Sequence, residues 1–202
     1  ATIYLYWQWF HYTRQSYGIA QAYRRAGPAV DGSLARNARL DHLAFYLVPL
    51  WGILHRAHQG PDRFLGQAVW HPPVPGAMVD MVALLAIAGL VWWGASRFIL
   101  WQRGALAVGH TLYVASHFAV FYTGYVVIDS IDAGWIALNI WHNAQYIAFV
   151  WLQNHRRFAD KPDAGARFLS WLSQRRNVYA YLVVCLGLST ALYVGLQWSA
   201  AA

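Results

Sequence analysis

The sequence is short of charged residues and has almost no cysteine. Asp, Glu, Lys and Arg together make up 11% of its 202 residues, whereas an average soluble domain carries about 25%. The single cysteine, Cys185, excludes an intramolecular disulfide, a cysteine-based zinc site and an iron–sulfur cluster ligated by this chain alone. Any bound metal must therefore take histidine or oxygen ligands.

Apolar residues are correspondingly abundant, at 58% of the chain. The stretch AMVDMVALLAIAGLVWWGASRFI, at 77–99, carries one acidic group and matches the roughly 20 residues that a helix needs to cross the hydrocarbon core of a bilayer. We therefore predict an all-α, polytopic integral membrane helical bundle that lies in the lipid bilayer of the plasma (inner) membrane.

The lengths of the apolar runs, and the breaks between them, predict about six membrane spans. These lie at about 1–22, 40–55, 77–99, 104–128, 135–153 and 178–198. The second span is short and contains Pro49, so it is either a kinked span or a re-entrant segment, which would leave five spans.

We predict that residues 1–202 form a single transmembrane domain. Because the chain begins at Ala1 inside an apolar run, without an initiator Met or a signal-peptide pattern, we expect a fragment of a longer polytopic protein. The expected partners, besides lipid, are other membrane subunits or the missing terminal helices.

The net charge of +7 comes from short basic clusters between the apolar runs. With six spans these clusters divide unevenly between the two sides of the membrane. The larger group is Arg24, Arg25, Arg36, Arg39, Arg97, Arg103, Arg156, Arg157, Lys161, Arg167, Arg175 and Arg176, and the smaller is Arg56 and Arg63. Because cytoplasmic loops collect Lys and Arg, both chain ends are predicted on the non-cytoplasmic side. No basic surface is long enough for nucleic acid, which we exclude as a partner.

The connection at 162–177 is more than a turn. It contains FLSWLS between basic residues, a pattern typical of a short amphipathic helix that lies in the plane of a membrane interface. We predict that this segment lies on the inner surface of the membrane.

Three of the predicted spans carry polar residues on one helical face, at i, i+3, i+4 and i+7 spacing. The three groups are Gln8, His11, Tyr12 and Gln15; His110, Tyr113 and His117; and Asn139, His142, Asn143 and Tyr146. Polar groups inside a bilayer cost free energy unless they face protein, a ligand or water. The three faces are therefore predicted to point to a common interior.

One histidine of each stripe lies at the same predicted depth. His11 is 13 residues from the nearest inner arginine along its span, and His117 and His142 are 14 residues from theirs. At about 1.5 Å per residue, all three imidazoles lie roughly 20 Å from the inner arginines. Three histidines at one level on three helices predict a site where they converge on one ligand.

Imidazole is the commonest protein ligand for transition metals, so we predict that His11, His117 and His142 bind iron, copper or haem. Amide and phenol groups near them are expected to orient the rings; these are Gln15, Tyr113, Asn139, Asn143 and Tyr146. The alternative is that the polar groups only hydrogen-bond one another between helices, at about 0.6 kcal/mol per bond.

A second group of histidines lies in the predicted external region. His55 and His58 have i, i+3 spacing that places both on one helical face, and His71 follows in the next connection. They form a possible second metal site outside the bilayer. The denser boxes HxxxH and HxxHH are absent from the chain.

Three functions agree with these features. The first is a histidine-ligated metal or haem redox protein of the membrane, a metal-dependent oxidoreductase that acts on a lipophilic or quinone-like molecule. The second is a non-catalytic subunit of an electron-transfer or photosynthetic complex that binds haem or a chlorophyll-type macrocycle. The third is a transporter whose polar stripes line an intramembrane pathway. It ranks last because the sequence has no internal repeat.

Overall fold

The computed structural model describes residues 1–27, 34–159 and 163–201, and these are almost entirely helical. The α-helices are α1 (Thr2–Arg25), α2 (Leu34–Gln59), α3 (Gly76–Gln102), α4 (Val108–Tyr122), α5 (Ile131–Arg157), α6 (Arg167–Leu172) and α7 (Val178–Ala201). The shorter elements are the strands β1 (Arg63–Phe64) and β2 (Gln67–Ala68), the π-helix η1 (Thr123–Val127) and the 3₁₀-helices η2 (Ala164–Ala166) and η3 (Arg175–Asn177). The predicted all-α class is confirmed.

Each predicted span overlaps a helix, and the one at 104–128 is divided between α4 and η1. In the described part of the chain, only α3 is both long and apolar enough to cross a membrane by length and composition. The six-span arrangement therefore stays a prediction. Helix α2 is longer than predicted, because its charged ends are helical as well and the helix continues through Pro49. Lys161 and Pro162, which belong to the predicted inner loop, lie outside the described residues.

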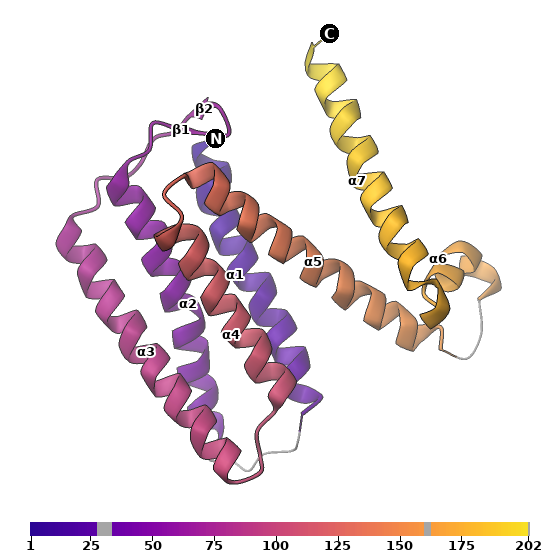
Figure 1. Cartoon of the computed structure of the whole chain (residues 1–202), viewed down its shortest axis with the longest axis horizontal. Helices are drawn as coiled ribbons and strands as arrows, with labels where there is room; N and C mark the ends of the chain where they lie inside the picture. The colour runs from indigo at the N-terminus through magenta and orange to yellow at the C-terminus, as the bar shows by residue number, and fades with distance from the viewer. Residues whose placement is uncertain (28–33, 160–162, 202) are drawn as a thin grey trace. The chain divides into compact units, whose positions relative to one another are not determined.

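The chain forms two compact units, residues 1–142 and 143–202, and the boundary falls inside α5. In the first unit α1, α2, α3 and α4 lie side by side and alternate in direction, with α2 packed against the other three (Figure 1). Its core contains Leu5 of α1, Phe45 and Val48 of α2, Phe121 of α4 and Leu138 of α5, each 2% exposed or less.

Glycines allow η1 to pack closely against its neighbours. A Cβ atom on Gly52 of α2 would lie 2.6 Å from the Cβ atom of Tyr125, and one on Gly134 of α5 would overlap the carbonyl oxygen of Gly124. Neither position has room for a Cβ atom at van der Waals distance, so a larger side chain at Gly52 or Gly134 would push the helices apart.

The α3 helix of the first unit exposes an extended apolar surface. The exposed side chains are Met78, Met81, Leu84, Leu85, Ile87, Val91, Trp92, Phe98, Ile99 and Trp101. Leu84 and Val91 are more than two-thirds exposed, at 69% and 68%. Apolar surface of this extent usually marks contact with another protein or with a membrane.

In the second unit, hydrogen bonds join the segment around α6 to the end of α5. His155 donates from Nδ1 to the carbonyl oxygen of Ser173 at 3.0 Å, and Gln174 donates from Nε2 to that of Phe158 at 2.9 Å. The backbone N–H of Asp163 donates to the hydroxyl of Ser170 at 3.0 Å. The predicted surface segment is therefore a short helical corner, of which 163–177 is described.

Candidate histidine site

The structure brings two of the three predicted histidines together inside the first unit. The ring centroids of His11, on α1, and His142, on α5, are 5.5 Å apart and the ring planes are inclined by 64°. The His142 ring is buried, whereas His11 is exposed on the outer side of α1. The pair thus has one member fixed in the unit and one accessible from outside.

A chain of hydrogen bonds lies directly beside the pair. The phenol ring of Tyr12 stacks on His142 with ring centroids 4.0 Å apart, and its hydroxyl donates to Oδ1 of Asn139 at 2.6 Å. Gln8 donates from Nε2 to the Tyr12 hydroxyl at 2.6 Å and accepts from the indole N–H of Trp135 at 2.7 Å. Because an indole only donates, the orientation of the Gln8 amide, and with it the direction of the chain, is fixed.

Only part of the predicted surroundings of the pair is found beside it. Asn139 belongs to the hydrogen-bonded chain, whereas Tyr113 stacks on Tyr23 at 5.2 Å and Gln15 is half-buried farther along α1. Asn143 and Tyr146 belong to the second unit, where both are exposed.

The site prediction omitted three residues that the structure places in this chain. Gln8 and Tyr12 were visible in the sequence as members of the first polar stripe, whereas Trp135 resembled the many other tryptophans of an apolar run. Its indole N–H reveals its role only when the fold places Gln8 opposite to it.

His117 lies in a different environment, next to a helical carbonyl that proline leaves free. Pro49 has no N–H, so the carbonyl of Phe45, four residues earlier in α2, lacks its usual helical donor. His117 is fully buried on α4, donates from Nε2 to this carbonyl at 3.1 Å and stacks on the Phe45 ring with centroids 3.7 Å apart. It therefore completes the hydrogen bonding of α2.

On α5, His117 contacts Trp141 rather than His142, and the ring centroids of His117 and Trp141 are 5.7 Å apart. Successive helical side chains point about 100° apart, so this contact is on another face of α5 than His142. Within the described residues no group of three or more His, Cys, Asp or Glu side chains is placed to hold one metal ion. The structure thus contains a histidine pair and a separate third histidine.

Two histidines of the possible second site, His58 and His71, form hydrogen bonds in the connection between α2 and α3. His71 accepts from the Tyr6 hydroxyl at Nδ1 at 3.0 Å and donates from Nε2 to the carbonyl of Pro61 at 2.9 Å. His58 donates from Nδ1 to the carbonyl of Val74 at 2.8 Å, and His55 is half-buried. Both ring nitrogens of His71 are therefore engaged in holding the loop.

Arg56 has a structural role that could not be predicted from the sequence. Its side chain is buried at the end of α2 and donates to the backbone carbonyls of Gly124, Ile128 and Asp129, the last at 2.7 Å. Its Nη1 also donates to Gln59 at 2.8 Å. The carbonyl of Gly124 lies within the π-helix and those of Ile128 and Asp129 follow it, where the regular helical hydrogen-bond pattern stops. Arg56 therefore supplies donors that the backbone does not provide there.

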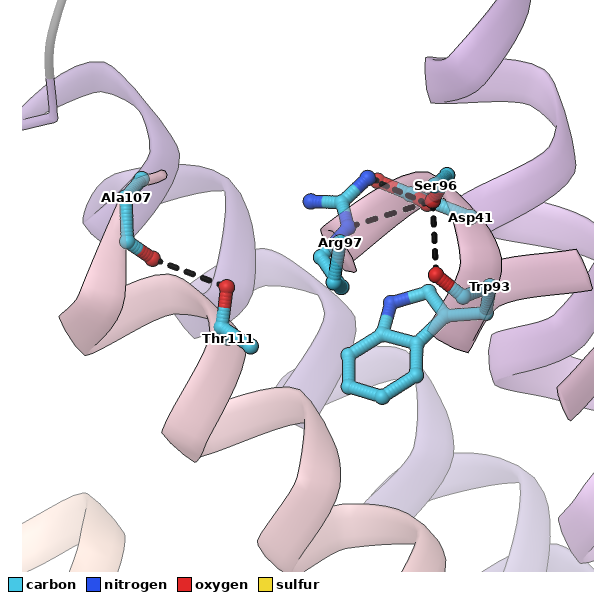
Figure 2. Close-up of polar contacts among 6 residues, drawn as sticks. All are labelled: Asp41, Trp93, Ser96, Arg97, Ala107 and Thr111. Atoms are coloured by element: carbon cyan, nitrogen blue, oxygen red, sulfur yellow. Dashed lines mark hydrogen bonds and ion pairs between the residues drawn. The ribbon is translucent and has the colours of Figure 1, made fainter. Parts of the chain in front are cut away.

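A buried ion pair joins α2 to α3 at the opposite end of the first unit. Arg97 contacts both carboxylate oxygens of Asp41 at 3.0 Å, and both side chains are about nine-tenths buried. Figure 2 shows the Arg97 Nε atom also pointing to the hydroxyl of Ser96, which donates to the carbonyl of Trp93. The guanidinium carbon lies 5.9 Å from the centroid of the Trp93 ring, so the buried charge is compensated on two sides.

Comparison of the chain with known protein families, with curated proteins and with solved structures gave no match.

Proposed function

We propose that the chain is a six-span integral membrane protein in which His11 and His142 bind an iron or copper ion, and that this ion carries out redox chemistry on a lipophilic, quinone-like molecule. The observation that carries the proposal is the contact between the two imidazoles, at a centroid separation of 5.5 Å. Neither ring is at the surface of a polar loop, and both lie on long helices.

The separation of the rings supports one shared ion. Metal–imidazole nitrogen bonds are about 2.0–2.1 Å long, so two imidazoles on a single ion have centroids roughly 5 Å apart. The same separation disfavours a haem or chlorophyll-type macrocycle between the two imidazoles. The imidazoles of His11 and His142 are in edge-to-face contact, which leaves no space for a macrocycle between them. The geometry therefore supports a compact ion better than an axially ligated tetrapyrrole.

The groups around the pair support a catalytic use of the ion. The Tyr12 ring stacks on the face of His142, and the Tyr12 hydroxyl is held by the amide oxygen of Asn139. These contacts support a fixed orientation of the His142 ring, which a metal ligand needs. The exposed position of His11 leaves room for an external ligand, and catalytic metal sites keep such an open position. An iron or copper ion supplies one-electron redox chemistry, while the protein residues bind and orient it.

The membrane location rests on composition and on exposed apolar surface. The apolar side chains of α3 face outward, and the charges of Asp41 and Arg97 are paired inside the unit. A lipid bilayer matches this distribution, because charged groups in a span must be paired whereas apolar groups can face the acyl chains.

The test is to purify the full chain from membranes and measure its iron and copper together with its visible spectrum. We expect one of the two metals at a constant ratio to protein, without a Soret or chlorin band. A macrocycle spectrum would support the tetrapyrrole-binding alternative, and a colourless, metal-free protein would contradict both. Alkaline carbonate extraction tests the location separately, and we expect the chain to remain in the membrane pellet.

A further inference from the structure

We propose that the helical corner around α6 binds the headgroups of anionic phospholipids. This inference rests on the membrane location proposed above and is independent of the metal site. Helix α6 buries only Leu172 among its large apolar side chains and exposes the others. Ser170 and Ser173 are buried against the second unit, whereas Phe168 and Trp171 are 63% and 43% exposed. Exposed aromatic side chains of this kind prefer the interface between water and lipid.

The charge of the second unit is mostly positive. Five exposed arginines lie in this part of it, namely Arg156, Arg157, Arg167, Arg175 and Arg176. The sequence of residues 143–202 has six basic residues and two acidic ones, Asp160 and Asp163. The carboxylate of Asp163 accepts the backbone N–H of Gly165 at 2.8 Å. A partner that matches this surface must therefore be anionic.

The aromatic and basic groups meet at a shallow hollow of about 650 Å³. It is lined by Asp163, Ala164, Arg167, Phe168 and Trp171. The rings of Phe168 and Trp171 lie nearly parallel, with centroids 6.5 Å apart, and Arg167 supplies the cation. This combination fits an amphiphile whose phosphate is anionic and whose adjoining chains are apolar.

The neighbouring helices favour a bilayer over a protein partner. Helix α7 begins directly after η3, and its large exposed side chains are hydrophobic, including Tyr179 at 80% and Val183 at 68%. Among the described residues of α7, Ser189 and Thr190 are also exposed. The basic corner thus continues into an apolar helix. A bilayer offers the same sequence of environments, an anionic headgroup layer followed by hydrocarbon.

The corner is also fixed in place. The hydrogen bonds from His155 to Ser173 and from Gln174 to Phe158 attach it to the end of α5, and Gln174 donates in addition to the carbonyl of Ser170 at 3.0 Å. An attached surface loses little conformational freedom when it binds, so the arginines can act together.

The test uses the full chain with Cys185→Ser and Ala164→Cys, labelled in the hollow with a polarity-sensitive dye and reconstituted in nanodiscs of phosphatidylcholine with increasing phosphatidylglycerol. We expect a blue shift that grows with the anionic lipid. Arg175→Gln with Arg176→Gln should raise the phosphatidylglycerol fraction at the midpoint, by roughly fivefold per arginine at most. The matched control is Arg63→Gln, an exposed arginine in the first unit, which should leave the midpoint unchanged.

An equal dye signal at every lipid composition, or an equal effect of Arg63→Gln, would overturn the inference. If the chain does not insert into a bilayer at all, the proposed membrane location fails. In that case, flotation with phosphatidylglycerol vesicles tests whether the corner binds anionic lipid. Binding that depends on Arg175 and Arg176 would support the inference, and no binding would overturn it.

Discussion

His117 donates a hydrogen bond to the backbone carbonyl of Phe45, 3.1 Å away on a neighbouring helix. That carbonyl needs an outside donor because Pro49 cannot supply the N–H that would normally bind it. His117, which the sequence predicted as a metal ligand, therefore joins α4 to α2. Its contribution to stability can be measured separately from any role in binding.

The bond between His117 and Phe45 predicts an energetic coupling between His117 and Pro49. In the natural chain, His117→Leu leaves the Phe45 carbonyl without a donor, and we expect a loss of about 1–3 kcal/mol in the free energy of unfolding. In a Pro49→Ala background the alanine N–H can bind the carbonyl, so the same change should cost about 1 kcal/mol less. Unfolding of the four variants in detergent measures the coupling. Strictly additive effects would contradict it.

Arg56 is predicted to be essential for the end of the π-helix. Arg56→Met removes the donor from three backbone carbonyls, and we expect it to cost about 3 kcal/mol or more. Arg56→Lys keeps the charge but not the planar fork, so its cost should be intermediate. The rate of amide hydrogen exchange in residues 123–129 should rise from the natural chain to Arg56→Lys and again to Arg56→Met. The exposed Arg63→Met serves as control, and an equal loss in both methionine variants would refute the role of Arg56.

The contact between Gly134 and Gly124 predicts that the two helices cannot accept a methyl group there. Gly134→Ala should destabilise the protein by about 1–3 kcal/mol, because the backbone must move to relieve the overlap. Gly94→Ala on α3 is the matched control. A Cβ atom there meets nothing within 4 Å, and alanine should stabilise the helix by up to about 1 kcal/mol. Thermal unfolding that ranks the two variants in the opposite order would contradict this packing.

The ion pair between Asp41 and Arg97 predicts that removing one of the two charges destabilises the protein more than removing both. Asp41→Asn leaves the buried guanidinium without its counter-charge, and we expect a loss of about 3 kcal/mol or more. Asp41→Leu combined with Arg97→Met removes both charges and should cost less than the single change. A double variant that is less stable than Asp41→Asn would show that the pair itself provides the stability.

The helices could be predicted from the sequence because their apolar runs are long. The run at 77–99 lies wholly inside α3, and the prediction for 178–198 begins at the first residue of α7. The helix around the predicted span at 40–55 is longer than predicted, because a hydropathy criterion stops at charged groups such as Arg56. In the folded chain the Arg56 side chain finds backbone partners inside the first unit, and the helix continues past it.

The candidate site could be predicted only in part. Helical spacing and depth indicated that His11 and His142 lie at one level, because both depend on local geometry alone. The position of His117 depends on a backbone carbonyl that Pro49 leaves free on another helix, and counting residues within one helix cannot detect such a partner. The break into a π-helix at Thr123 likewise depends on its packing against Gly52 and Arg56.

The metal-to-protein ratio of matched histidine variants tests the central claim most directly. We expect the purified natural chain and His42→Ala, which removes an exposed histidine outside the pair, to carry the same amount of iron or copper. His11→Ala and His142→Ala, folded as judged by circular dichroism, should each have lost it. A His142→Ala protein that retains the full metal content of the natural chain would contradict the account.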